Sequence, residues 1–145
     1  MTNERYAYLL IVEEEYWDIL IQRAEGPSTT QAFVRRSRVG PLKVEKLLFY
    51  VTKKRKVLGF ANFMDRQTGN PESLWRAYGA ETCFGSVEEY QKFVDGRLNV
   101  AFIRFNDLQR IANPRTREEV AEILGPMRGF GAGRYLDEET ASQLL

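Results

Sequence analysis

Histidine is absent from this chain of 145 residues, and cysteine occurs once, as Cys83. Histidine is the commonest general base and the commonest metal ligand of proteins, so its absence removes the usual acid–base catalyst. Structural zinc sites are built from cysteine and histidine, so such a site is nearly excluded. A lone cysteine cannot form an internal disulfide, which fits a reducing compartment. We therefore expect no metal and no cofactor.

Long apolar runs are also lacking. The longest, at 7–12 and 47–51, are far too short to cross a bilayer. The N-terminus has neither the basic start nor the apolar stretch of a signal peptide. We expect a cytoplasmic protein with no membrane partner. With 43% hydrophobic and 28% charged residues, and no internal repeat or low-complexity tract, the chain is typical of one globular domain spanning 1–145.

An excess of charge of one sign is missing too. Lysine and arginine total 21, aspartate and glutamate total 20, and the net charge is +1. Binding to nucleic acid through the total charge of the molecule is therefore not expected. A local basic face remains open, because the distribution of charge matters more than its sum.

The pattern of apolar residues and turn signals predicts an α+β fold. Thr116 with Glu119, and Ser86 with Glu89, are spaced as capping boxes, and Gly59 is placed at a bulge or a close approach. The expected strands are 6–12, 31–37, 45–52, 57–64 and 98–105, and the expected helices are 13–24, 71–78, 86–95, 116–124 and 137–145. This irregular order favours a small mixed sheet, curled toward a β-barrel, with peripheral helices.

The segment from Met127 to Leu136 combines glycines, arginines and aromatic residues. Alternating glycines let a backbone adopt positive φ and bring its N–H groups close to a ligand. Arginine binds phosphate, and aromatic rings stack on bases. The segment therefore suits a nucleotide or an oligonucleotide, and the alternative is a tight connection whose rings fill the core. Its candidate ligand-binding residues are Arg128, Gly129, Phe130, Gly131, Gly133, Arg134 and Tyr135.

Four further residues are candidates for a binding site. Arg35 and Arg36 lie near the end of a short predicted strand, and arginine is a common phosphate ligand. Trp75 and Tyr78 lie about one helical turn apart and either line a ligand pocket or form a packing stripe. The basic run 53–56 is interpreted as a solvated hairpin turn.

Several short motifs follow one another in a set order along the chain. They are a strand and a tryptophan-bearing helix (8–12 and 15–20), a hairpin (46–51 and 57–61), the pair 74–79 and 88–90, and a late Phe130-Gly131 before an acidic helix. This order resembles the PUA-like superfamily, which includes PUA, ASCH, EVE and YTH modules, and within it an uncharacterised, mostly archaeal family. The resemblance implies a curled β-barrel with peripheral helices that binds RNA, or a modified base held in a pocket.

The chain departs from two of these modules. ASCH modules carry a glycine–lysine–glutamate–arginine signature, whereas residues 40–46 keep glycine, lysine and glutamate but end in lysine at altered spacing. No ASCH catalytic role is therefore carried over. YTH modules depend on a tryptophan cage, and nothing in the sequence brings Trp17 and Trp75 together.

Three functions are consistent with the sequence. The first is a non-catalytic module that binds RNA or a modified nucleobase. The second is a small amidohydrolase acting on modified nucleosides, in which Lys43, Glu45 and a hydroxyl such as Thr30 supply the chemistry. The third is a protein-interaction module without a nucleic-acid ligand. The sequence makes no prediction of the oligomeric state.

Overall fold

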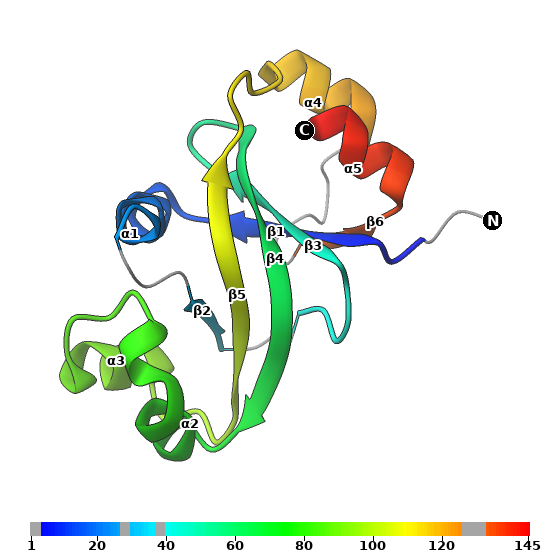
Figure 1. The fold of residues 1–145 in the computed structure, drawn as a ribbon. Helices are drawn as coiled ribbons and strands as arrows, with labels where there is room; N and C mark the ends of the chain where they lie inside the picture. Colours follow the sequence, from blue (N-terminus) through cyan, green and yellow to red (C-terminus); the bar gives the residue numbers. More distant parts are fainter. Residues whose placement is uncertain (1–3, 27–29, 37–39, 126–132) are drawn as a thin grey trace.

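Six strands form one sheet in the computed structural model, which describes residues 4–26, 30–36, 40–125 and 133–145 (Figure 1). The strands are β1 (Ala7–Val12), β2 (Gln31–Arg35), β3 (Lys46–Val51), β4 (Lys56–Gly69), β5 (Val100–Arg110) and β6 (Arg134–Leu136). The helices are α1 (Glu14–Ala24), α2 (Pro71–Tyr78), α3 (Val87–Val94), α4 (Arg117–Leu124) and α5 (Glu138–Leu144), with a short 3-10 helix, η1 (Gly79–Glu81). The predicted α+β class is confirmed.

The strands are ordered β2-β5-β4-β3-β1-β6, so β2 and β6 form the two edges of the described sheet. β1 pairs with β3 in parallel, and the other pairs are antiparallel, so the sheet is mixed as predicted. The sheet curls far enough for Arg35 Nη1 on β2 to donate a 3.3 Å hydrogen bond to Tyr8 Oη on β1. Among the described residues, no backbone pairing joins the two edge strands β2 and β6, so the predicted barrel is not confirmed.

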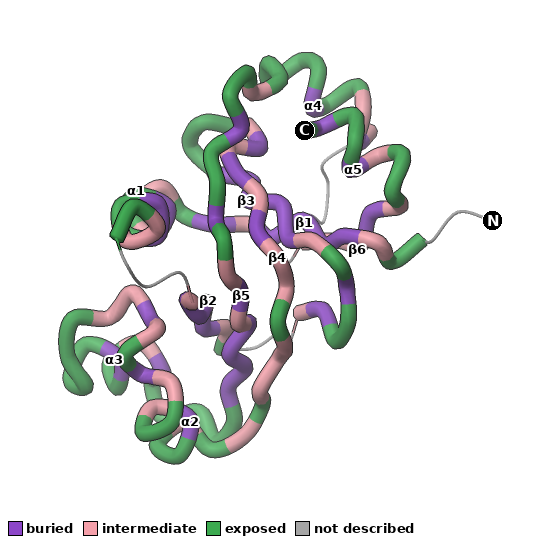
Figure 2. The backbone as a smooth tube through the Cα atoms, in the orientation of Figure 1, coloured by how far each residue is buried: buried purple, intermediate pink, exposed green. Residues whose placement is uncertain are grey.

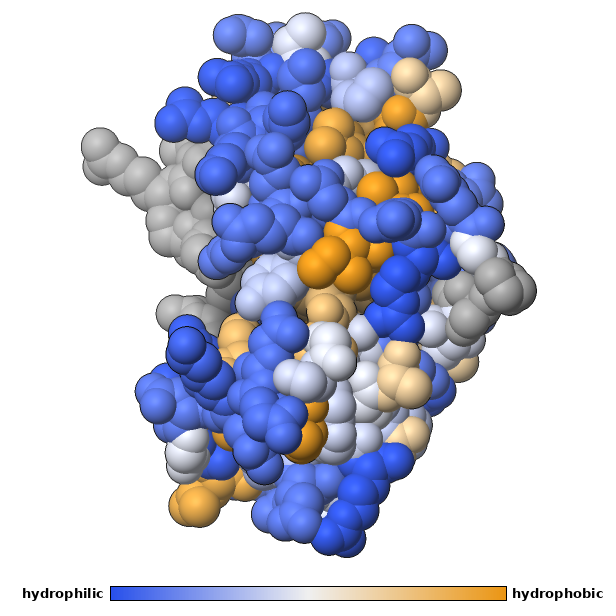
Figure 3. Space-filling model, turned by 90° about the vertical axis from the view of Figure 1, so that its left-hand side faces the viewer, coloured by the Kyte–Doolittle hydropathy of each residue, from blue (hydrophilic) through white to orange (hydrophobic). Residues whose placement is uncertain are grey.

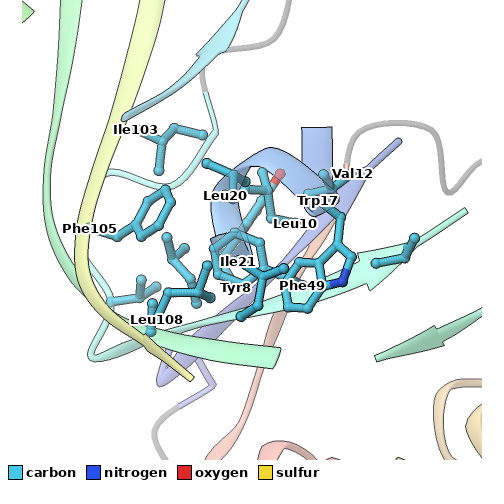
Figure 4. Packing of buried hydrophobic residues seen from close by; sticks show 14 residues of the cluster. Tyr8, Leu10, Val12, Trp17, Leu20, Ile21, Phe49, Ile103, Phe105 and Leu108 are labelled. Atoms are coloured by element: carbon cyan, nitrogen blue, oxygen red, sulfur yellow. The ribbon is translucent and has the colours of Figure 1, made fainter. Parts of the chain in front are cut away.

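Helix α1 explains why the sheet stays open. Its buried side chains, Trp17, Leu20 and Ile21, pack with residues of β1, β3 and β5 in one core cluster (Figure 4). The side chain of Gln31, at the start of β2, donates a 2.9 Å hydrogen bond from Nε2 to the carbonyl of Leu20. The helix therefore attaches to β2 beside its free edge, and in the described sheet β5 alone pairs with that strand.

The continuous apolar sequence of β1 reflects burial on both faces of the sheet. Tyr8 and Leu10 point into the cluster that contains α1, whereas Ala7 and Leu9 belong to a second cluster with α4 and α5. A third cluster joins β2 and β5 to α2 and α3. Burial accordingly concentrates on the strands, and the outward surfaces of the helices are exposed (Figure 2). Figure 1 places α4 and α5 at one end of the long strands β4 and β5, and α2 and α3 at the other.

The predicted helix starts are confirmed, with one difference. Thr116 and Glu119 form a complete capping box at α4. At α3 the Ser86 side chain accepts from the backbone N–H of Glu89, but the Glu89 carboxylate accepts from Gly85 N–H, 3.0 Å away. The reciprocal half of the second box is therefore absent, because the carboxylate bonds one residue earlier in the chain.

The largest differences from the predicted strands concern β4, β5 and β6. β4 continues to Gly69 and β5 to Arg110, because the polar end of β4 pairs with the start of β5 and the end of β5 pairs near Gly59. β6 was predicted as part of a loop, but its three residues pair with Ala7 to Leu9 of β1. Across the described ranges, no helix is long and apolar enough to span a membrane.

Gly59 lies where the β3–β4 register shifts, so the predicted bulge is confirmed. A Cβ atom there would stand 2.4 Å from the Trp17 ring and 2.7 Å from the Gln109 carbonyl oxygen. We expect Gly59→Ala to lower the free energy of unfolding by about 2 kcal/mol through overpacking, measured by urea denaturation. Gly85→Ala is the control, because its Cβ would meet only Glu89 Oε2 at an ordinary 3.5 Å. Equal losses in the two variants would contradict this account.

Candidate functional site

A cleft of about 260 Å³ runs along the free edge of β2, between the start of α1 and the helix α3. We call it the β2 cleft. Figure 3 shows the side of the molecule that lies on the left in Figure 1, where orange apolar patches are interspersed with blue polar surface. The residues that line the cleft are Ile11, Glu13, Tyr16, Ala32, Phe33, Val34, Arg35, Arg36, Cys83, Phe84 and Phe93.

The position of β2 at the edge of the sheet gives the cleft its polar wall. An edge strand pairs on one side only, so its other side presents backbone N–H and C=O groups. β2 pairs with β5, and the consecutive residues 32–36 line the cleft. Ala32 and Val34 are buried, whereas Phe33 and Arg35 are partly exposed and Arg36 is exposed. A ligand can therefore reach this segment only at the three residues that are not buried.

Aromatic rings also line the cleft: Phe33 comes from β2 itself, and three further rings come from α1 and from the segment that includes α3. Tyr16 contacts the edges of Phe33 and Phe84, in each case with ring centroids 6.3 Å apart, and Phe84 lies 5.1 Å from Phe93. All four rings are partly exposed. Because they hold one another in place, the wall is preformed and offers flat apolar surface to a planar guest.

Two predicted residues, Arg35 and Arg36, line the cleft and point in different directions. Arg36 is exposed; its guanidinium lies 5.0 Å from the Phe93 ring centroid, and its Nη1 donates to the Phe93 carbonyl at 3.4 Å. Arg35 is partly buried and bonds Tyr8 as described above. Glu13, at the N-cap of α1, adds one carboxylate to the lining and makes no side-chain cap bond.

Burial favours the neutral forms of two groups in the cleft, Cys83 and Tyr16. Burial raises the pKa of Cys83 to about 11, and this effect exceeds the opposing one of the Arg23 cation. Burial also raises the pKa of Tyr16, with a further contribution from Glu13. At neutral pH both groups are protonated, so Cys83 is a weak nucleophile.

Two arginines fix the segment that carries Cys83 and Phe84. Arg23 of α1 donates to the carbonyl of Thr82 and, at 2.6 Å, to that of Ala80. Arg104 of β5 bonds Glu81 through Nε at 2.8 Å and Nη2 at 3.1 Å, and Asp65 through Nη1 at 2.8 Å. The bonds and charges of Glu81 and Asp65 hold the pKa of Arg104 above its ordinary value. The cleft wall is thus tied to α1, β4 and β5.

Trp75 and Tyr78, the predicted aromatic pair, lie outside the β2 cleft. Tyr78 packs under Arg104, whose guanidinium is 4.4 Å from its ring centroid. Trp75 stacks on Tyr90 with centroids 4.6 Å apart. Both rings belong to the α2–α3 layer, so the structure supports the packing interpretation for Tyr78.

The late glycine-rich segment is described only in part. Arg128, Gly129, Phe130 and Gly131 lie outside the described residues. Gly133 has φ +96°, and an added Cβ would stand 2.3 Å from the Leu9 carbonyl oxygen, so glycine is needed there for a close approach to β1.

Arg134 and Tyr135 hold the same segment in place. Arg134 Nη1 donates at 2.9 Å to the carbonyl of Leu124, the last residue of α4. The Tyr135 ring meets the edge of Tyr8 at 5.2 Å. Tyr8 thereby contacts both Arg35 and Tyr135, and the structure brings these two predicted residues to one neighbour. Neither Arg134 nor Tyr135 lines the β2 cleft.

The residues of the hydrolase hypothesis do not line the cleft either. Lys43 and Glu45 are exposed, and Thr30 is partly exposed. The sequence analysis did not identify Glu13, Tyr16, Cys83 or Phe84 as site residues. They come together only because β2 is an edge strand, which the sequence does not show. Among the residues that the structure describes, no three metal-binding side chains are grouped.

Comparison with known proteins identifies the fold. The sequence matches no protein-family model and no curated protein. The structure is similar to that of ASCH from Zymomonas mobilis, with a TM-score of 0.74 and 22% identity over 96% of this chain and 93% of that one. Two single-residue variants of that protein match with TM-scores of 0.75 and 0.76, at 23% and 20% identity. The chain therefore shares the fold of these ASCH structures, which agrees with the predicted resemblance at the level of the fold.

The raised pKa of Cys83 has a direct chemical consequence. The thiolate is the reactive form, so alkylation by iodoacetamide should accelerate with pH up to about 11. Near neutral pH we expect it to be about 100-fold slower than in the urea-unfolded chain, because the thiol of an exposed cysteine ionises about two pH units lower. Mass spectrometry follows the single site. A plateau near the ordinary cysteine pKa would contradict a desolvated thiol.

Proposed function

We propose that this protein is a non-catalytic binding module for single-stranded RNA, and that it holds one base, plain or modified, in the β2 cleft. The observation that best supports this proposal is that the β2 cleft combines the edge of a strand, a group of packed aromatic rings and two arginines. The ASCH fold supports the same class of ligand, because the PUA-like resemblance implies RNA binding.

Each wall of the cleft has a role in this proposal. Backbone N–H and C=O groups of Phe33, Arg35 and Arg36, the residues of this segment that are not buried, form hydrogen bonds with the edge of the base. The rings of Phe84 and Phe93 provide apolar surface for its face. Arg36, which is exposed and lies beside the ring of Phe93, contacts the adjoining phosphate. Sequence preference then comes from the strand edge and affinity from the cation.

The shape of the cleft favours a single strand over a duplex. Bases in a duplex are stacked and paired, so an edge and a face of the same base become available together only when the base is splayed out. A volume of about 260 Å³ lies just below the usual range of small-molecule sites, which suits one base better than a larger cofactor. We place the protein in the cytoplasm, since its one cysteine is free.

A peptide is the second candidate ligand, and the free edge of β2 is the observation that favours it. An extended peptide can add to such an edge by main-chain hydrogen bonding. This arrangement needs neither Arg36 nor an aromatic wall, so the two candidates differ in their dependence on charge.

The test measures binding of a fluorescent single-stranded oligonucleotide at two salt concentrations. We expect Arg36→Glu to weaken binding about tenfold or more, since a charge-assisted contact is replaced by repulsion. Arg36→Ala should reduce the slope of log K against log salt by about 0.7, the value for one phosphate contact on a single strand.

Lys53→Glu is the matched control. Lys53 is exposed in the β3–β4 hairpin and does not line the cleft, so its variant makes the same change in net charge elsewhere. Equal effects of Arg36→Glu and Lys53→Glu would reduce the interaction to total charge and contradict the proposal. Absence of RNA binding by the unmodified protein would contradict it outright.

A further inference from the structure

The β2 cleft is the first of three hollows that share walls. A second hollow, of about 550 Å³, shares Cys83 and Phe84 with the cleft and reaches the ring of Trp75. A third, of about 520 Å³, lies between α2 and α3 and has Trp75 as part of its own wall. We call this third hollow the α2–α3 groove. The three hollows are therefore neighbours on the surface: Cys83 and Phe84 adjoin the first two, and Trp75 adjoins the second and the third.

The lining of the three hollows is more basic than the molecule as a whole. It includes five arginines and only two carboxylates, Glu13 and Glu72, whereas the complete chain is nearly balanced in charge. Glu72 is occupied by Arg76, whose Nη2 lies 2.5 Å from it. Arg97, at the far side of the groove, is exposed, and its side chain has no hydrogen bond or ion pair recorded with the described part of the chain. An extended anion complements this surface.

The groove is rigid. The ring of Trp75 stacks on Tyr90, and Gly79 lies against it so closely that an added Cβ would stand 2.7 Å from the ring. Tyr90 donates a 2.7 Å hydrogen bond from its hydroxyl to the carbonyl of Pro71. Trp75 is thus packed against both Tyr90 and Gly79, and it forms part of the wall of both hollows. Val87, 37% exposed, adds apolar surface beside it.

We infer that one strand of RNA continues from the β2 cleft past Phe84 and Trp75 into the α2–α3 groove, where Arg97 contacts a phosphate. This inference rests on the proposed function and extends it, because it makes the ligand an oligonucleotide with a defined path. Single-strand binding surfaces commonly combine a basic groove with aromatic residues in this manner. Affinity should therefore rise with the length of the RNA until both hollows are occupied.

The test compares a mononucleotide with an octanucleotide on the unmodified protein and on Arg97→Ala. We expect the octanucleotide to bind at least about tenfold more tightly than the mononucleotide. Arg97→Ala should remove most of this advantage while leaving mononucleotide affinity within about twofold. Arg36→Ala, by contrast, should weaken both ligands, because its contact lies at the cleft.

Val87→Glu is a second variant on the groove wall. Val87 is the first residue of α3, where an acidic side chain is favourable, so the fold should tolerate the change while the added charge repels phosphate. It should resemble Arg97→Ala, and Lys53→Glu should leave the length dependence intact. Thermal unfolding of each variant shows that the fold is retained.

The outcomes separate the inference from the proposed function. If Arg36→Ala weakens both ligands and the groove variants weaken neither, RNA stops at the cleft: the inference fails and the proposed function stands. If the groove variants weaken the mononucleotide as much as the octanucleotide, Arg97 and Val87 do not act on a distal phosphate, and the inference also fails. If the unmodified protein binds neither ligand, both are overturned.

Discussion

The packing of α1 into the mouth of the curled sheet is the constraint on which the other features depend. Trp17, Leu20 and Ile21 fill the space inside the curl, and Gln31 ties the helix to β2. The helix packs against the inside of the curl, and in the described sheet β2 pairs with β5 alone. An open strand edge therefore persists, and the cleft lies along it. The open sheet and the candidate site have the same structural origin.

Much of the fold could be predicted from local patterns, since those patterns record local physics. The capping residues Thr116 and Asp137 mark helix starts because their side chains accept from N–H groups three residues later. Gly59 marks the bulge because the indole of Trp17 leaves no room for a Cβ. The end of β4 was not predicted because Arg66 and Gln67 are polar and give no strand pattern. They are in a strand because they pair with β5, which is distant in the sequence. β6 was missed because three residues carry too little pattern.

The site was predictable only where a single residue type carried the signal. Arg35 and Arg36 were predicted because arginine beside an aromatic strand is informative in itself, and both line the β2 cleft. Arg134 has a similar sequence setting, yet it bonds the carbonyl at the end of α4. The neighbouring residues in the sequence do not distinguish Arg134 from Arg36. The two arginines differ in the backbone carbonyl that the folded chain brings close to each of them. Tyr16 was read as part of a buried stripe, and its partial exposure depends on the edge position of β2.

The anchoring of η1 has a consequence for how a guest would be received. Arg104 joins Glu81 to Asp65, and Arg23 holds Thr82 from the opposite side, so the segment before Phe84 is fastened to three separate elements. These bonds order the wall when the protein folds, before any ligand binds. A ligand that enters would restrict few additional torsions of the protein, and the entropic penalty of association would then fall mainly on the flexible partner.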